Sequence, residues 1–371
     1  MIGEYLSGNY SISELARRRG ISRQNAYKWI ERYEQEGWKG LEERCRAAHE
    51  HPNAISQGLE RRILELKAQW PLWGAPKIHS KLLEYADCPS ESTVSNVLER
   101  HGLSRKLRRR SRATPSEQPL SHCQEPNEVW CADFKGWFRT ADGRRCDPLT
   151  ISDGCSRYLL CCRGLAETTG WLVVQPLFEL TFREYGLPEA MRTDNGAPFA
   201  SRGLAGLSKL SVWWLLLGIG LERIEPGKPQ QNGRHERMHR TLKEATARPP
   251  RANLRRQQEA FDAFRREYNE QRPHEALGQR PPGDFYRPST RDYPSRLLEP
   301  EYPDDWQKRK VSVGGQMKWN GSKIQISHAL AEQVVGLRPI GEGLWTIYFA
   351  SLELGQLDER RRRLTPIRTL P

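Results

Sequence analysis

One short stretch of the 371-residue chain decides the fold, and it reads Val129-Trp130-Cys131-Ala132-Asp133-Phe134. Its apolar and aromatic side chains alternate with others, which predicts a strand from Val129 to Phe138. Because successive side chains point to opposite faces of a strand, Asp133 lies on the face opposite Trp130. A carboxylate within an aromatic strand costs free energy unless it is paired or functional. Asp133 is therefore the first candidate functional residue.

The sequence around this strand predicts a mixed α/β core, which we place at residues 128–289. The further predicted elements are strands at Asp147–Ser152 and Tyr158–Cys162, a helix capped by Thr168 that runs to about Tyr185, and a short strand at Glu189–Thr193. Asp194 directly follows the last of these strands. Strand ends in α/β sheets are where ligand sites are usually built, so Asp194 is the second candidate.

A third acidic candidate, Glu236, lies where a turn enters a predicted helix, in Pro229-Gln230-Gln231-Asn232-Gly233-Arg234-His235-Glu236-Arg237. Asn232 and Glu236 are four residues apart, so they share a face of that helix. Arg240 and Lys243 continue the same face, which predicts a cationic stripe beside the carboxylate. A stripe of this kind suits DNA phosphates, so Asn232, Arg240 and Lys243 are candidate DNA-binding residues.

Asp133, Asp194 and Glu236 make chemical sense as one site. Three carboxylates brought together repel one another unless cations lie between them. Oxygen ligands select hard divalent cations such as Mg²⁺ or Mn²⁺. Two such ions, about 4 Å apart, can activate a water or a 3′-hydroxyl and stabilise the leaving oxygen of a phosphodiester. The three residues are therefore candidates for one metal site that acts on phosphodiesters, although each one taken alone is better explained as an ordinary surface group.

Other conspicuous residues have simpler structural explanations. Asp153 precedes a glycine in a pattern typical of a hairpin turn, and Trp213 and Trp214 are expected in the core. His235 is the helical neighbour of Glu236 and is expected to point about 100° away from it, which argues against a catalytic role.

Residues 1–48 predict a helix-turn-helix DNA-binding domain. Ser11 opens a first helix in a capping-box pattern, and Ser22 opens a second one after a glycine turn. The first turns of the second helix hold residues that can contact base edges, and the candidates are Arg23, Gln24, Asn25 and Lys28. The alternative is an ordinary helical hairpin with a solvated cationic face.

Residues 49–103 predict a second, divergent helix-turn-helix-like unit, in which Pro76 opens one helix and Ser90 or Ser92 caps the next. The linker predicted at 104–127 begins with a basic run that suits phosphate contacts, with candidates Arg105, Lys106, Arg108, Arg109 and Arg110. A merely solvated linker would explain the same run. Residues 290–309 predict another linker, and residues 310–371 predict a small β-barrel-like, all-β domain with a basic tail.

Charge and composition point to nucleic acid and away from membranes. The formal net charge is +13, from 59 Lys and Arg against 46 Asp and Glu, which favours a polyanionic partner. No apolar run approaches the roughly 20 residues that span a bilayer, and no secretory signal is expected. Eight cysteines without CxxC spacing favour reduced thiols, so a cytoplasmic, nucleoid-associated protein is expected. A P-loop pattern is absent from the sequence, so no nucleotide cofactor is expected.

Four motifs in this order resemble those of DDE transposases of the retroviral-integrase superfamily, specifically the bacterial insertion-sequence type. The motifs are Trp130–Phe134, Thr193–Phe199, Pro229–Arg237 and Tyr268–Leu277. The resemblance implies a ribonuclease-H-like integrase core preceded by helix-turn-helix units. It also implies that Asp133, Asp194 and Glu236 are the metal ligands for cutting and joining transposon-end DNA.

The sequence departs from the family pattern in one interval. Between Asp194 and Glu236 there are 41 residues, which is longer than the family's usual spacing. We expect the additional residues in a loop within Ser201–Trp214, a stretch rich in Gly, Ser and Leu. A loop insertion of this kind costs little free energy, so it is not expected to disable the site.

The expected fold class is multidomain, with N-terminal all-α helix-turn-helix units, an α/β ribonuclease-H-like core and a small C-terminal all-β domain. The expected function is a transposase that binds the terminal inverted repeats of a mobile element, hydrolyses the end phosphodiester with two Mg²⁺ or Mn²⁺ ions, and joins the freed 3′-hydroxyl to target DNA. Two ends must be handled together, so a homo-oligomer on double-stranded DNA is expected. A catalytically silent DNA-binding regulator and a stand-alone metal-dependent nuclease of the same fold are the alternatives.

Overall fold

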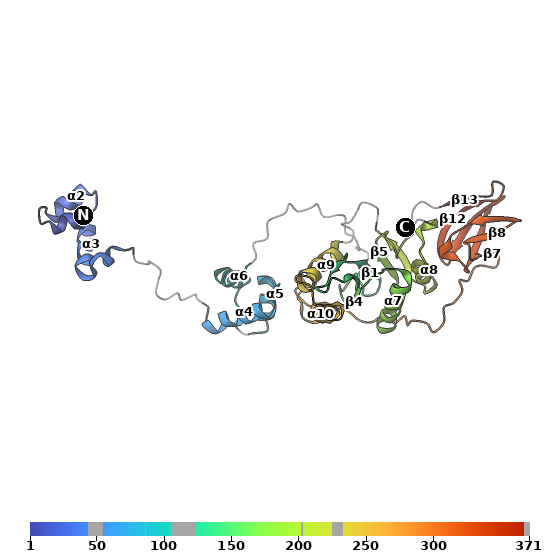
Figure 1. The fold of residues 1–371 in the computed structure, drawn as a ribbon, viewed down its shortest axis with the longest axis horizontal. Helices are drawn as coiled ribbons and strands as arrows, with labels where there is room; N and C mark the ends of the chain where they lie inside the picture. Colours follow the sequence, from blue (N-terminus) through green and yellow to red (C-terminus); the bar gives the residue numbers. More distant parts are fainter. Residues whose placement is uncertain (44–54, 86, 105–122, 202, 225–232, 367–371) are drawn as a thin grey trace. The chain divides into compact units, whose positions relative to one another are not determined.

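The computed structural model describes residues 1–43, 55–85, 87–104, 123–201, 203–224 and 233–366 (Figure 1). The chain divides into two compact units, Met1–Ser56 and Gln57–Pro371, which are described separately. No helix among the described residues is long and apolar enough to cross a membrane. The basic run from Arg105 to Arg110 and the turn residue Asn232 lie outside the described residues.

The first unit consists of helices, bounded as α1 Ile2–Leu6, α2 Ile12–Arg18, α3 Arg23–Glu36 and the 3₁₀ helix η1 Gly37–Leu41. Ser11 caps α2 together with Glu14 in a capping box, as its sequence pattern predicts. Ser22 caps α3, and Gly37 ends it with a φ of 62°, which glycine adopts without strain. The helix-turn-helix expected at this end of the chain is confirmed.

The second unit opens with the helices α4 Gln57–Gln69, α5 Ala75–Leu82 and α6 Glu91–Arg100. Their apolar stripes pack together through Ile63, Ile78 and Val94, each fully buried. Ser90, rather than Ser92, caps α6 by accepting a hydrogen bond from the backbone of Thr93. The loop between α4 and α5 contacts the core, because the indole of Trp73 donates to the Glu267 carboxylate at 2.9 Å.

The core is built on one mixed sheet, with strands bounded as β1 Val129–Phe134, β2 Phe138–Arg139, β3 Arg145–Asp153, β4 Leu159–Leu165, β5 Ala190–Thr193 and β6 Gly220–Arg223. β1 lies between β3, to which it is antiparallel, and β5, to which it is parallel. β6 runs parallel to β5, while β3 also pairs with β2 and β4. This topology confirms the predicted α/β core.

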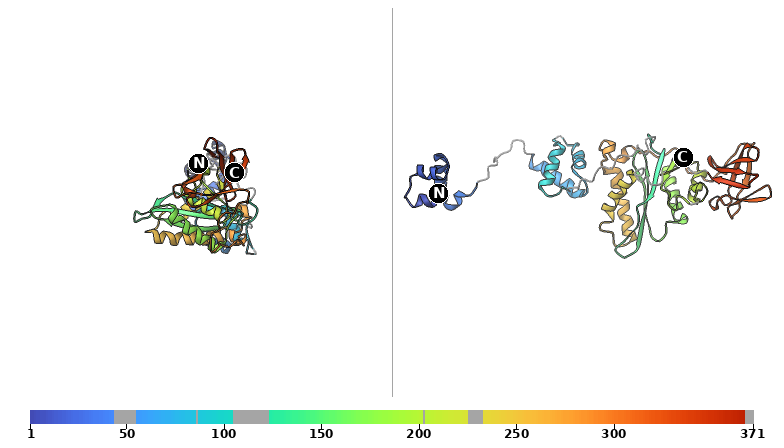
Figure 2. Two further views of the ribbon diagram at one scale, coloured as in Figure 1. Left: turned by 90° about the vertical axis from the view of Figure 1, so that its right-hand side faces the viewer. Right: turned by 90° about the horizontal axis from the view of Figure 1, so that it is seen from above.

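Helices cover both faces of this sheet (Figures 1 and 2). α7 Trp171–Tyr185 and α8 Lys209–Leu216 pack on one face, and α9 Gly233–Thr246 and α10 Leu254–Arg266 pack on the other. After α10 the chain continues as short turns, η4 Glu267–Gln271 of π type, then η5 Glu275–Leu277 and η6 Pro282–Asp284 of 3₁₀ type.

Two local predictions in the core need correction. The strand predicted from Val129 to Phe138 stops at Phe134, because the chain turns at Gly136 with a φ of 83° before the short β2. The helix predicted to start at a Thr168 cap begins at Trp171 after Gly170. The Thr168 hydroxyl instead accepts a hydrogen bond from the Gly170 backbone amide, which stabilises the turn before the helix.

The stretch expected to be an inserted loop also differs from the prediction. It contains the 3₁₀ turn η2 Leu204–Gly206, and from Lys209 it forms α8, which Ser208 caps. One face of α8 buries Trp213 and Trp214 in the core, as expected for these tryptophans. The other face contributes Val212 and Leu215 to the apolar cluster of the C-terminal domain. A helix that is apolar on all sides is buried between two bodies, so the segment is a structural link rather than a loose insertion.

The C-terminal domain is all-β, as predicted, with strands β7 Gln307–Lys310, β8 Gln316–Trp319, β9 Ser322–Gln325, β10 Val334–Gly341, β11 Leu344–Phe349, β12 Leu352–Asp358 and β13 Arg363–Pro366, and with the turn η7 His328–Leu330. β7 begins within the stretch expected to be a linker. Within the described residues the sheet order is β13-β12-β11-β10-β7, and β8 pairs with β9.

Replacing Leu215 with Ala should destabilise the core and the C-terminal domain together. Leu215 is 7% exposed and packs into the apolar cluster shared by the two bodies. Loss of its buried side chain is expected to lower the free energy of unfolding by about 2 to 3 kcal/mol in urea denaturation. Leu180→Ala, at a side chain that is 60% exposed on α7, is the matched control and should change little. Loss of hydrogen-exchange protection in only one of the two bodies would contradict a shared core.

Candidate active site

Asp133 and Asp194 come from neighbouring parallel strands at equivalent positions. In the register of β1 and β5, Ala132 pairs with Thr193, so Asp133 and Asp194 are the residues that directly follow this pair. The carboxyl ends of parallel strands meet at one edge of a sheet. Asp194 is held in its turn by the Gly196 backbone amide, which donates to its carboxylate at 3.1 Å. The two aspartates are thus brought to the same edge, as the sequence pattern predicts.

Glu236 reaches the same region from α9, which packs across the face of the sheet that bears Asp133. Thr150, the β3 residue paired with Asp133, anchors the helix. Its hydroxyl lies 2.7 Å from a ring nitrogen of His235 and 2.7 Å from one of His239, which lie one residue before and three residues after Glu236. Glu236 itself is exposed, whereas His235 is buried against the sheet. The side chains of Glu236 and His235 thus point in different directions, as expected for adjacent residues of a helix.

The electrostatic surroundings of Asp133 link it to the other two carboxylates. Burial first, and then the negative charges of Asp194 and Glu236, together raise the pKa of Asp133 to about 7, against the lowering effects of a Phe134 backbone hydrogen bond and of Lys135. A raised pKa from like charges is the signature of carboxylates sharing one site. The arrangement therefore carries excess negative charge that a cation would balance.

A second set of groups around Asp133 was not foreseen from the sequence. The Nδ1 atom of His239 lies 3.9 Å from the Asp133 carboxylate, and Asp133, His235 and His239 could together offer ligand atoms to a metal. Burial lowers the pKa of both histidines, in His235 to about 3, so both rings are neutral at physiological pH. The four-residue spacing of the two histidines was the available signal, because it puts both on one helical face.

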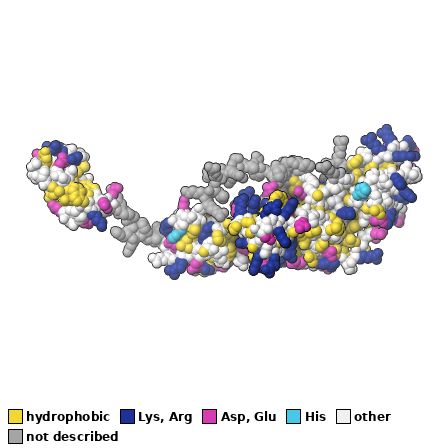
Figure 3. Space-filling model, viewed as in Figure 1, with side chains coloured by type: hydrophobic (Ala, Val, Ile, Leu, Met, Phe, Trp, Pro, Cys, Tyr) yellow, Lys and Arg dark blue, Asp and Glu magenta, His cyan; other side chains and the backbone are white. Residues whose placement is uncertain are grey.

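Arg240 and Lys243 lie exposed on α9, at four and seven residues after Glu236. They form the predicted cationic stripe that begins at the carboxylate. Lys and Arg side chains gather over the part of the molecule that carries α9 and α10 (Figure 3). The pKa of Lys135, just after Asp133, is lowered by burial and by the nearby Lys243, so the positive charge reaches the site itself.

The predicted recognition residues of the first unit are all accessible. The exposed side chains at the start of α3 are Arg23, Gln24, Asn25 and Lys28. Ala26 and Ile30 of the same helix are buried, so the apolar stripe faces the other helices and the polar residues face solvent. The structure thus leaves this end of α3 free to contact a ligand.

A Thr150→Val variant should lose stability and some of the positioning of the site. The Thr150 hydroxyl donates to the Asp133 carbonyl at 3.1 Å besides contacting the two histidines. Valine keeps the shape but leaves these buried groups without their partner, which is expected to cost about 2 kcal/mol of unfolding free energy in urea titrations. Thr150→Ser retains the hydroxyl and should behave like the wild type. Equal stability of the Val and Ser variants would show that the hydroxyl has no such role.

Family models match the chain in each of its parts. They are an integrase core domain over residues 124–229 and again over 217–282, a homeodomain-like domain over 25–98, a helix-turn-helix domain over 1–47, and the C-terminal domain of IS481 family transposases over 306–365. The matches follow the order of the helical, α/β and all-β bodies seen in the structure.

Similar proteins come from bacterial insertion elements. The chain is 28% identical over 257 residues to the uncharacterized 31.7 kDa protein of insertion element IS407 of Burkholderia multivorans, covering 68% of this chain and 89% of that protein. It is 29% identical over 237 residues to the uncharacterized 39.2 kDa protein of insertion element IS476 of Xanthomonas euvesicatoria, covering 63% and 66%. Among solved structures, the HTLV-2 integrase catalytic core domain in complex with magnesium is 14% identical, with a TM-score of 0.34 over 44% of this chain and 98% of that one.

Proposed function

We propose that this chain, a DDE transposase of the retroviral-integrase superfamily and of the bacterial insertion-sequence type, hydrolyses the phosphodiester at the ends of a mobile element and joins the freed 3′-hydroxyl to target DNA. The observation that carries the proposal is the placement of Asp133 on β1 beside Asp194 at the end of β5, together with the effect of the Asp194 and Glu236 charges on the pKa of Asp133. Asp133, Asp194 and Glu236 are the proposed catalytic residues.

The same residues fit a divalent metal ion. All of the donors are carboxylate oxygens, which Mg²⁺ and Mn²⁺ prefer. The pKa of Asp133 is raised by burial and by two neighbouring carboxylates, so the site is short of positive charge. We propose that Asp133, Asp194 and Glu236 hold two such ions. When bound, divalent ions make a water or a 3′-hydroxyl a better nucleophile and stabilise the leaving oxygen.

Side chains around the carboxylates would bind the DNA strand and position the catalytic groups. Arg240 and Lys243 follow Glu236 on one face of α9 and would hold the phosphates of the DNA strand beside the site. Thr150 contacts His235 and His239 of α9, so it would help to position Glu236 relative to Asp133. These contacts orient the groups before the reaction, which is where much of an enzyme's rate enhancement arises.

We propose that the N-terminal helices select the DNA. Arg23, Gln24, Asn25 and Lys28 at the start of α3 are the groups placed to read base edges of a terminal inverted repeat. Arg105 to Arg110 in the linker and Asn232 before α9 are further proposed phosphate contacts. A homo-oligomer on double-stranded DNA follows from the need to hold two element ends together, and the bacterial cytoplasm is where such DNA is found.

The proposal is tested by strand transfer in vitro. Labelled duplexes taken from the DNA that flanks the reading frame are incubated with the purified protein and Mg²⁺ or Mn²⁺. Joined products of defined length are expected. Tight binding without cutting in either metal would favour a silent DNA-binding regulator, and cutting without joining would favour a nuclease of the same fold.

A further inference from the structure

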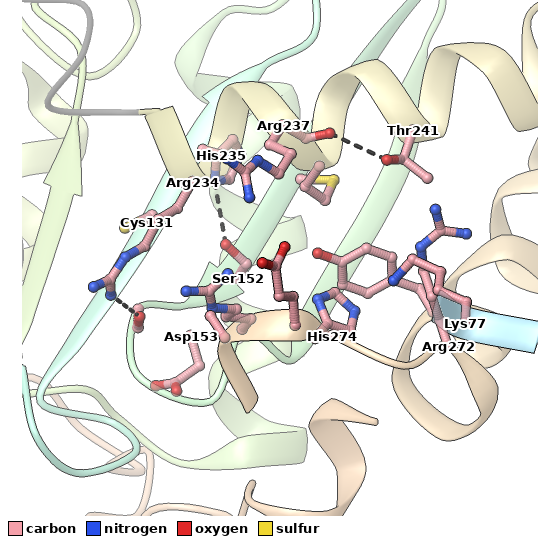
Figure 4. A pocket seen from close by; sticks show the side chains of 16 residues that line it. Lys77, Cys131, Ser152, Asp153, Arg234, His235, Arg237, Thr241, Arg272 and His274 are labelled. Carbon is pink, nitrogen blue, oxygen red and sulfur yellow. Dashed lines mark hydrogen bonds between the residues drawn. The ribbon is translucent and has the colours of Figure 1, made fainter. Parts of the chain in front are cut away.

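A cationic pocket lies on the side of α9 next to the candidate active site (Figure 4). It has a volume of about 260 Å³ and is bounded by α5, by the turn between β3 and β4, by α9, and by the segment that follows α10. Its cationic lining residues are Lys77, Arg157, Arg234, Arg237 and Arg272, and the neutral rings of His235 and His274 line it as well. None of the three proposed metal ligands lines the pocket, although His235, which lies beside Asp133, does, so the pocket adjoins the active site.

The negative charges near the pocket do not balance these cations. The Asp153 carboxylate is buried and is already occupied, because it accepts hydrogen bonds from the Asn127 amide and from the amide and hydroxyl of Ser156. Glu275 is exposed. Arg272 is also paired with Glu267, outside the lining, at 3.6 Å. Five Lys and Arg side chains therefore face three carboxylates, of which that of Asp153 is engaged elsewhere.

Two buried polar atoms at the pocket lack a partner. Among the described residues, neither Nε of Arg157 nor Nε2 of His274 has a hydrogen-bond partner. Leaving a buried donor unsatisfied costs about 1 to 3 kcal/mol, so such atoms call for an explanation. An acceptor bound in the pocket would supply one. The Arg157 backbone also has a φ of 65°, a conformation that residues other than glycine rarely adopt and that clusters at functional sites.

The lowered pKa values of the lining residues are those expected of cations crowded together without an anion between them. Burial first, with the positive charges of Arg272 and Arg237, lowers the pKa of Lys77 to about 8, although Glu267 and Glu275 act in the opposite direction. Burial lowers the pKa of His274 to about 3, assisted by Lys77, Arg272 and Arg157. The pKa of Arg157 is also lowered, by burial and by neighbouring arginines. Lys77 and the arginines thus repel one another across the pocket, and their charges keep the His274 ring neutral.

The elements around the pocket hold these groups in place. Arg234 donates to the Gly154 carbonyl at 2.9 Å, and Lys77 donates to the Pro273 carbonyl. The chain enters the Arg272–His274 segment through the π-helix η4, a rare conformation that is frequent at functional sites. Figure 4 shows Arg234 and Arg237 descending from α9 on one side of the pocket, and Lys77, Arg272 and His274 on the other.

We propose that this pocket binds a phosphate group, with the guanidinium groups of Arg157, Arg237 and Arg272 as its principal ligands. Guanidinium groups match phosphate oxygens in bidentate geometry. Several cations together can balance the charge of a phosphate dianion, or of a phosphodiester and the phosphates next to it in a strand. The phosphate belongs either to a DNA strand or to a free phosphate compound. The strand is favoured because Arg237 directly follows Glu236 on α9, and that choice of source rests on the proposed function.

The test compares DNA binding and phosphate binding in the full-length chain carrying Asp194→Asn, so that binding is measured without cutting. Fluorescence anisotropy of a labelled, mixed-sequence duplex is followed across a series of salt concentrations. Arg157→Gln and, separately, the more exposed Arg237→Gln are expected to weaken binding by about tenfold and to reduce the salt slope by about one. Arg183→Gln, which removes the same charge from α7 on the other face of the sheet, should leave the slope unchanged.

A second arm measures the shift of the melting temperature caused by inorganic phosphate. Loss of this shift in both pocket variants, with unchanged DNA affinity, would support a site for a free phosphate compound. The proposal would be overturned if both variants fold correctly and keep the wild-type DNA affinity, the wild-type salt slope and the wild-type melting-temperature shift with phosphate. Because neither arm requires joined DNA, a failure of the strand-transfer assay leaves the result on the pocket unaffected.

Discussion

An Asp194→Asn protein is expected to join DNA on the order of a thousandfold more slowly than the wild type while binding it equally well. Asp194 follows β5 at the position next to Asp133, and its charge contributes to the raised pKa of Asp133. Asparagine keeps the size of the side chain but removes the charge that would hold a divalent ion, so stabilisation of the reaction's transition state is lost. The measurement is the rate of joined-product formation under single-turnover conditions.

The matched control is Asp305→Asn, at an exposed aspartate close to β7. It makes the same chemical change away from the site and should join DNA at the wild-type rate. A rate within a fewfold of the wild type for Asp194→Asn would remove this residue from the proposed ligand set. A large loss of DNA affinity in the same variant would point instead to a misfolded core.

An Asp133→Asn protein should be more stable than the wild type at neutral and alkaline pH, although it should not join DNA. The Asp133 side chain is 20% exposed, and burial and neighbouring carboxylates raise its pKa to about 7 from a usual value of 3.8. In the folded state the carboxyl thus keeps its proton over a pH range in which the unfolded chain has released it. The stability that this provides is complete below about pH 4 and is lost as the pH rises through about 7.

The size of the effect follows from the shift in pKa. A change of about three units corresponds to about 4 kcal/mol at most, and solvent screening brings the expected loss in metal-free protein to roughly 2 to 4 kcal/mol between pH 4 and pH 8. Urea denaturation across this range should show the decline in the wild type and a flatter profile in Asp133→Asn. Mg²⁺ at pH 8 should stabilise only the wild type. Parallel profiles without a response to Mg²⁺ would argue against charge crowding at Asp133.

The sequence was most informative where the structure depends on neighbouring residues alone. Alternation around Asp133 predicts both a strand and the face on which the carboxylate lies, since the period of a strand is local. The Ser11 and Ser22 caps are likewise recognisable because a cap and the amide that it accepts lie within three residues. The order of the acidic motifs then indicates the core, because each lies at the end of an element.

The features that could not be predicted depend on contacts between distant segments. α8 lies where the sequence suggests a loop, and its burial follows from the two bodies that enclose it. The contact between Thr150 and His239 joins residues 89 positions apart. The cations of the phosphate pocket come from α5, from a hairpin turn, from α9 and from the segment after α10, so no single stretch of sequence contains the pattern.

The position of α8 limits how the C-terminal domain can be exchanged between related chains. Its tryptophan-bearing face belongs to the core, and its Val212 and Leu215 face belongs to the β domain. A recombination junction placed after α8 would join a β domain to a helix face that evolved against a different partner. A crossover before Leu204 keeps α8 with its own β domain, and exchange is then expected to succeed only when the core residues that pack on Trp213 and Trp214 are matched in the two chains. The segment that can be exchanged as one piece therefore begins inside the catalytic core and not at the first strand of the β domain.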